Sequence, residues 1–103
     1  MITFTQFIIK QLRKSDYLGR YGGEEFLIVA PGAKASNHET MFERICKHIR
    51  ENKIPTEKGN LSITVSIGVA PYTGVENSDM LLAAADTAMY DAKEAGRDRV
   101  VYA

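Results

Sequence analysis

The sequence predicts one small α/β sandwich domain in which helices and strands alternate along the chain. Three segments repeat apolar residues at spacings of three and four, the period of an amphipathic helix. Other segments are continuous apolar runs or alternate strictly between apolar and polar residues, as strands do. The chain has 103 residues, of which 45% are hydrophobic, enough for one core and not for two. The pattern does not fix the strand order.

The first third of the chain predicts a helix followed by a tight hairpin. A helix is expected over residues 3–14, and its apolar face is made of Phe4, Phe7, Ile8 and Leu12. A hairpin is expected over residues 17–30, with its turn at Gly22 and Gly23. The unbroken apolar run of residues 26–30 indicates a strand that lies inside a sheet covered by helices.

The clearest helix is predicted over residues 37–51, where Ser36 and Glu39 have the spacing of a capping box. Its apolar stripe consists of Phe42, Ile45, Cys46 and Ile49. The polar residues 52–60 predict a loop. Residues 61–70 alternate and predict a half-covered strand, in which Gly68 indicates a close backbone approach.

The end of the chain predicts a helix over residues 79–95 and a short strand over residues 99–102. Ser78 is the expected N-cap residue and Gly96 the expected C-cap residue. Many alanines in this helix favour close packing against the sheet.

Composition and charge exclude several classes of protein. Thirteen Lys and Arg balance thirteen Asp and Glu, so no basic surface for duplex nucleic acid is indicated. No apolar run has the length of a membrane span, and residues 1–4 lack the pattern of a signal peptide. We therefore expect a cytoplasmic location without membrane contact. The one cysteine, Cys46, is interpreted as a reduced, buried thiol, since neither histidine has the context of a catalytic triad.

The sharpest motif is Arg20-Tyr21-Gly22-Gly23-Glu24-Glu25-Phe26. Two glycines allow the backbone to approach a ligand, and two adjacent carboxylates at a turn suit Mg²⁺ together with substrate phosphates. The spacing alone favours a simpler interpretation, a hairpin turn with two solvated glutamates.

Residues 22–26 nevertheless resemble the signature of the GGDEF, or diguanylate cyclase, family in its GGEEF form. The resemblance extends from about residue 3 to the end, because Arg20-Tyr21, residues 64–70 and residues 85–100 match further family motifs in the right order. It implies an α/β sandwich of the nucleotidyl cyclase type with a central, mainly antiparallel sheet.

The resemblance implies condensation of two GTP molecules into cyclic di-GMP, with release of pyrophosphate, across an antiparallel homodimer. It makes Glu24 and Glu25 catalytic residues and ligands of Mg²⁺ or Mn²⁺, and it assigns substrate binding to Gly22, Gly23, Lys93 and Arg97. Lys93 and Arg97 are four apart, which is expected to put them on one helical face. Without the resemblance, both would be interpreted as cations that complement a helix C-terminus.

Arg13-Lys14-Ser15-Asp16 resembles the family's inhibitory RxxD site for the product, cyclic di-GMP. The resemblance assigns product binding to Arg13, Asp16 and Arg44. Taken alone, Arg13 would be a helix-end cation and Asp16 a turn former.

Residues 1–103 are interpreted as a single truncated GGDEF domain that lacks the family's N-terminal strand and helix. The D-x-D-x-F-K and guanine-reading motifs of the family do not occur in the sequence. We therefore expect this chain alone to be inactive as a cyclase. The alternative is a cyclic di-GMP-binding sensory or dimerisation module without catalysis. An uncovered strand edge would favour oligomerisation by sheet extension.

Overall fold

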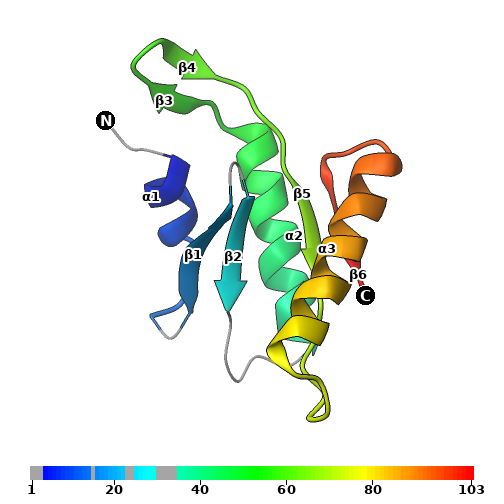
Figure 1. The fold of residues 1–103 in the computed structure, drawn as a ribbon. Helices are drawn as coiled ribbons and strands as arrows, with labels where there is room; N and C mark the ends of the chain where they lie inside the picture. The colour runs from blue at the N-terminus through cyan, green and yellow to red at the C-terminus, as the bar shows by residue number, and fades with distance from the viewer. Residues whose placement is uncertain (1–3, 15, 23–24, 30–34) are drawn as a thin grey trace.

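The computed structural model describes residues 4–14, 16–22, 25–29 and 35–103, and it confirms the alternation of helices and strands (Figure 1). The elements are α1 Phe4–Ile9, β1 Tyr17–Gly22, β2 Glu25–Val29, α2 Ala35–Glu51, β3 Ile54–Thr56, β4 Gly59–Leu61, β5 Ser66–Val69, α3 Ser78–Glu94 and β6 Arg99–Tyr102. No helix within these ranges is both long enough and apolar enough to cross a membrane.

The strands in the described ranges form three two-stranded pairs. β1 pairs with β2 and β3 with β4, both antiparallel, whereas β5 pairs with β6 in parallel. Antiparallel pairing therefore predominates, as expected. Within the described residues, hydrogen bonds do not join the three pairs into a single central sheet.

Helix α2 supplies the centre of the core. The predicted stripe of α2 is confirmed, because Phe42, Ile45, Cys46 and Ile49 are all buried. Phe42, Ile45 and Ile49 belong to one core cluster with Ile8 of α1 and Val69 of β5, against which partly buried residues of β1, β2 and β6 pack. In Figure 1, α2 accordingly runs between the β1–β2 pair and the β5–β6 pair. One helix thus covers apolar side chains of both pairs.

Helix α3 packs on β5 through a close backbone contact. A Cβ atom built on Gly68 would overlap the carbonyl oxygen of Ala85 and the amide nitrogen of Met89. This close approach is the one predicted for Gly68. Ala88 and Ala92 are the buried residues of α3, and their small side chains permit the short distance between helix and strand.

Helix α1 ends at Ile9, five residues before its predicted end. After Lys10 the backbone leaves the α-helical pattern, because the N–H groups of Gln11 and Leu12 bond to the carbonyls of Ile8 and Ile9, three residues back. The N–H of Arg13 then bonds to Asp16 Oδ2 at 2.8 Å and not to the carbonyl of Ile9, as it would in a continued helix. The side chain of Asp16 therefore stabilises the turn that follows α1.

The loop predicted over residues 52–60 is wrong, because a short hairpin, β3–β4, occupies most of it. Ile54 pairs with Leu61, and Ile54 is buried. The strand predicted over residues 61–70 is correspondingly shortened to β5. The hairpin was concealed because its strands are three residues each and hold few apolar side chains, of which Ile54 is buried.

Two predicted helix starts also differ from the structure. Helix α2 begins at Ala35, so Ser36 lies inside it. At α3 the N-cap residue is Asn77, whose side-chain Oδ1 accepts from the N–H of Met80 at 2.8 Å, and Ser78 is the first helical residue. Asn and Ser are nearly equal as N-caps, so the sequence does not discriminate between neighbouring positions.

Candidate functional site

The strands that flank the double-glycine turn are described, whereas the turn itself is not. Gly22 ends β1 directly opposite Glu25, the first residue of β2, after a shift in register that follows Arg20. Gly23 and Glu24 lie outside the described residues, as does the side chain of Glu25. Among the side chains that are described, no group of three or more His, Cys, Asp or Glu is placed to hold a metal ion.

The two predicted phosphate-binding cations lie at the end of α3. Lys93 is in the last helical turn, and the helix closes with two backbone hydrogen bonds, from Gly96 N–H to Lys93 O (3.3 Å) and from Arg97 N–H to Ala92 O (2.9 Å). These bonds form a Schellman motif, with Gly96 at a φ of +121° just after the C-cap residue Ala95. Gly96 therefore lies one position beyond the C-cap, whereas the sequence had predicted it as the C-cap residue itself.

Arg97 is not on the helical face of Lys93, and this part of the prediction is wrong. Helix α3 ends at Glu94, and Arg97 has a φ of +65° in the turn that leads to β6. Both side chains are exposed, and neither forms an ion pair with a carboxylate in the described ranges. Two cations four residues apart are thus exposed to solvent, Lys93 from the end of α3 and Arg97 from the turn that follows it.

Asp98 continues the left-handed conformation with a φ of +49° and contacts α2. Arg50 Nε donates to Asp98 Oδ2 at 2.8 Å and to Oδ1 at 3.0 Å. The thiol of Cys46 lies 3.8 Å from Asp98 Oδ1 and 3.8 Å from the carbonyl oxygen of Val65. Sequence reasoning missed the contact between Arg50 and Asp98, because 48 residues separate them and no pattern in the sequence links the two.

Cys46 is the buried free thiol that was predicted, with 1% of its surface exposed. Burial raises the pKa of the Cys46 thiol, and this effect exceeds the opposite effect of the nearby Arg50 guanidinium. The thiol therefore stays neutral at physiological pH and has the character of a packing residue.

The predicted product site brings Arg13 and Asp16 into direct contact between α1 and β1. Arg13 Nη2 donates to Asp16 Oδ1 at 2.7 Å, and Arg13 Nε lies 3.1 Å from the same oxygen. The Asp16 side chain is fully covered, whereas the Arg13 side chain is 43% exposed. Its hydrogen bond with Asp16 raises the pKa of Arg13. Asp16 thus fixes the guanidinium of Arg13, and part of the Arg13 side chain faces solvent.

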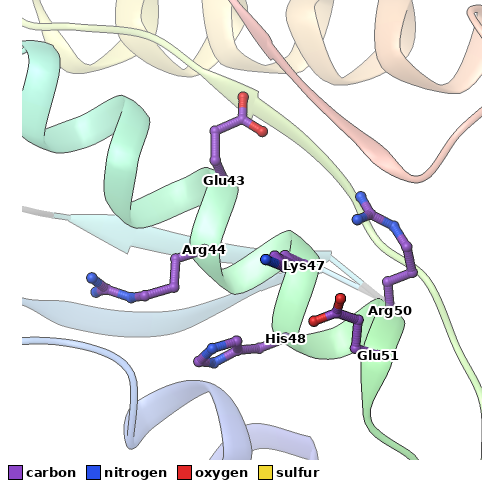
Figure 2. A pocket seen from close by; sticks show the side chains of 6 residues that line it. All are labelled: Glu43, Arg44, Lys47, His48, Arg50 and Glu51. Carbon is purple, nitrogen blue, oxygen red and sulfur yellow. The ribbon is translucent and has the colours of Figure 1, made fainter.

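Arg44 lies near this contact, on the exposed surface of α2. Its Nη2 is 3.5 Å from the carbonyl oxygen of Gln11, two residues before Arg13. Figure 2 shows Arg44 and His48 on one side of α2 and Arg50 pointing to another side. The surface here is an open hollow of about 490 Å³, lined by Glu43, Arg44, Lys47, His48, Arg50 and Glu51.

The two candidate sites lie at opposite ends of β1. The Arg13–Asp16 contact precedes its first residue, and Gly22 is its last, a separation of roughly 20 Å for six strand residues. In Figure 1, the ends of β1 and β2 that flank the turn and the C-terminal end of α3 all lie toward the upper part of the view, with α2 between the β1–β2 pair and α3.

Comparison with protein families gives a match to the diguanylate cyclase, GGDEF domain, over residues 1–99. The chain belongs to this family. Diguanylate cyclase A of Treponema denticola is 37% identical over 89 residues, which is 85% of this chain and 24% of that protein. The chain thus spans about a quarter of the length of this GGDEF relative.

Solved GGDEF structures share the fold. Diguanylate cyclase SiaD of Pseudomonas aeruginosa, in complex with its activator SiaC, superposes with a TM-score of 0.85 at 34% identity, over 95% of this chain and 38% of that one. The GGDEF domain of DgcB from Caulobacter crescentus, in complex with c-di-GMP, has a TM-score of 0.82 at 29% identity, over 94% and 61%. The predicted GGDEF fold class is confirmed.

Proposed function

We propose that this GGDEF domain serves the condensation of two GTP molecules into cyclic di-GMP, with release of pyrophosphate. The observation that carries the proposal is a pair of exposed cations at the end of α3, Lys93 in the last helical turn and Arg97 in the turn that follows it. Exposed cations of this kind suit a triphosphate, because charge-assisted hydrogen bonds to phosphate are strong.

In this proposal, Glu24 and Glu25 supply the carboxylates for catalysis and for a divalent metal, Mg²⁺ or Mn²⁺. Carboxylate oxygens combined with substrate phosphates are the ligands that Mg²⁺ prefers, and the bound metal would stabilise charge on the phosphate oxygens. Gly22 and Gly23 leave room for the nucleotide beside the backbone. Lys93 and Arg97 hold the phosphates in place for in-line attack.

Calorimetric titration of the 103-residue chain with GTP and Mg²⁺ tests the binding step. We expect binding that Lys93→Ala and Arg97→Ala each weaken about tenfold or more, the scale of a lost charge-assisted contact. Lys58→Ala, an exposed lysine in the β3–β4 turn, is the matched control and should bind as the unmodified chain does. Equal affinities for all four proteins would contradict the assignment.

Turnover is a separate measurement. We propose that residues 1–103 alone do not form cyclic di-GMP, since the D-x-D-x-F-K and guanine-reading motifs are absent from this sequence. Chromatography of GTP incubated with the chain and Mg²⁺ checks this, and steady formation of cyclic di-GMP would contradict it.

A second candidate function is binding of cyclic di-GMP without catalysis. The preformed Arg13–Asp16 contact favours it, with Arg44 close by and nearly half of the Arg13 side chain open to solvent. Arginine planes stack on bases and grip phosphates, and the covered Asp16 carboxylate would hold the Arg13 guanidinium in position for such a contact. Titration with cyclic di-GMP should show binding that Arg13→Ala abolishes, and an unchanged isotherm for this variant would remove the candidate.

The proposal includes a homodimer, because the condensation joins two GTP molecules and each domain would hold one of them. Strand β2 has β1 as its neighbour, and no other described strand pairs with its second edge, where Val29 is 46% exposed. Free edges favour pairing between chains. We expect Val29→Lys to reduce dimer formation in sedimentation velocity, whereas Val75→Lys, at an 82% exposed loop position, should not. A monomer at all concentrations would contradict this.

A cytoplasmic location also belongs to the proposal. GTP is a cytoplasmic nucleotide, and the free thiol of Cys46 requires no oxidising compartment.

A further inference from the structure

Three consecutive residues after α3 have positive φ angles, namely Gly96, Arg97 and Asp98. Glycine adopts this conformation without cost, whereas Arg and Asp do so only when surrounding contacts hold them. The Schellman hydrogen bonds account for Gly96 and for the N–H of Arg97. They do not reach Asp98, so the last residue of the turn has to be held by something outside α3.

The contact that holds Asp98 comes from the last turn of α2. Arg50 Nε bonds to both carboxylate oxygens, and Arg50 Nη2 lies 3.7 Å from the sulfur of Cys46. Cys46 is buried in the core, so its thiol and the Asp98 carboxylate together fix the position of the Arg50 guanidinium. The hydrogen bond with Asp98 raises the pKa of Arg50. The backbone of Arg97 is therefore held from both sides, by α3 before it and by Arg50 after it.

We propose that Arg50 is a positioning residue for the triphosphate site: it holds Asp98 and thereby fixes the direction in which Arg97 presents its guanidinium. The inference rests on the proposed function, in which Arg97 binds a phosphate. Arg50 itself does not touch the nucleotide. Its contribution is preorganisation, since a guanidinium that is fixed in advance loses less freedom when the ligand binds.

A purely stabilising role for the ion pair gives different results from a positioning role. A stabilising pair would change the melting temperature and leave the affinity of the folded protein for GTP unchanged. A positioning pair acts through Arg97, so its loss should have no effect once Arg97 has been removed. A non-specific effect of positive charge on α2 would appear equally at Lys47, an exposed residue of the same helix.

The experiment measures the affinity of the 103-residue chain for GTP with Mg²⁺ by calorimetry, for Arg50→Gln, Asp98→Asn and the control Lys47→Gln. Asparagine tolerates a positive φ, so Asp98→Asn removes the charge while the turn can still form. We expect Arg50→Gln and Asp98→Asn to weaken binding about three- to tenfold, with Lys47→Gln unchanged. Arg50→Lys should restore part of the affinity. In an Arg97→Ala background, Arg50→Gln should have no further effect.

Amide hydrogen exchange gives a readout that does not depend on nucleotide. The N–H of Arg97, bonded to Ala92 O, should exchange faster in Arg50→Gln than in the unmodified chain or in Lys47→Gln. If the unmodified chain fails to bind GTP, the proposed function is rejected, and this exchange rate still decides whether Arg50 holds the turn. Unchanged exchange, or an equal loss of affinity in the Arg97→Ala background, would overturn the positioning role.

Discussion

Replacing Gly68 by alanine tests the packing that places Lys93 and the turn after it. The added Cβ would overlap backbone atoms of Ala85 and Met89 and would lie 2.9 Å from Met89 Cα. Real Cβ atoms essentially never come closer than 3.0 Å to such neighbours. Because backbone atoms cannot rotate away as a side chain does, α3 itself would have to retreat from β5 by roughly 1 Å.

The cost follows from this geometry. Overpacking of a core costs about 1–3 kcal/mol where side chains can yield, and a helix that must move as a whole belongs at the upper end. We therefore expect Gly68→Ala to lower the free energy of unfolding by about 3 kcal/mol, a large part of the total for a domain of this size. The corresponding fall in melting temperature is roughly 12–24 °C.

Urea denaturation followed by circular dichroism measures the effect, and Gly19→Ala is the matched control. Gly19 also lies in a strand, but its added Cβ would meet the ring of Tyr17 at 3.1 Å, and Tyr17 is 65% exposed and free to turn. The control should change stability by less than about 1 kcal/mol. If both variants unfold at the same urea concentration, the tight α3–β5 contact is not a determinant of stability.

Three further predictions follow from local contacts. Asn77→Ala removes the N-cap of α3 and should cost about 1 kcal/mol in urea denaturation, and a loss equal to that of Ser78→Ala would contradict this. Cys46, whose pKa is raised by burial, should react with a thiol reagent at pH 8 only when the chain unfolds; rapid reaction in the native state would be inconsistent with a buried thiol. Hydrogen bonds from the side chain and backbone of Thr73 lower the pKa of the Glu76 carboxyl, so their stabilising effect is present at neutral pH and is lost on acidification through the lowered pKa. In an NMR titration, Thr73→Val should raise the pKa of Glu76, and an unchanged pKa would exclude the hydroxyl contact.

The elements that the sequence predicted correctly are those whose signal comes from burial. The stripe of α2 and the small residues of α3 are periodic because the core selects them, and the structure buries them accordingly. Gly68 was recognisable because a glycine inside an alternating strand often marks a bulge or a close approach of another backbone. The β3–β4 hairpin was missed because its strands are three residues each and hold few apolar residues, of which Ile54 is buried.

The site was predictable to the extent that its residues lie in local motifs. Arg13 and Asp16 are three residues apart, and the structure joins them by hydrogen bonds. The spacing of Lys93 and Arg97 indicated a shared helical face, but the helix ends between them, and no periodicity reveals where a Schellman turn begins. Arg50 and Asp98 form a contact between distant segments, and a single sequence contains no signal for such a pair.

Both candidate sites depend on α2, although they share no pocket in the described part of the chain. Arg44 contacts the carbonyl of Gln11 beside the Arg13–Asp16 turn, and Arg50, six residues later, holds Asp98 beside Arg97. Six residues of helix separate the two arginines by roughly 9 Å along an axis that Ile45 and Ile49 fix in the core. Within the described residues, α2 is thus the element that directly contacts both sites. Any energetic coupling between a ligand at Arg13 and a triphosphate at Arg97 would therefore be expected to shift α2, because a rigid, buried helix transmits displacement from one end to the other.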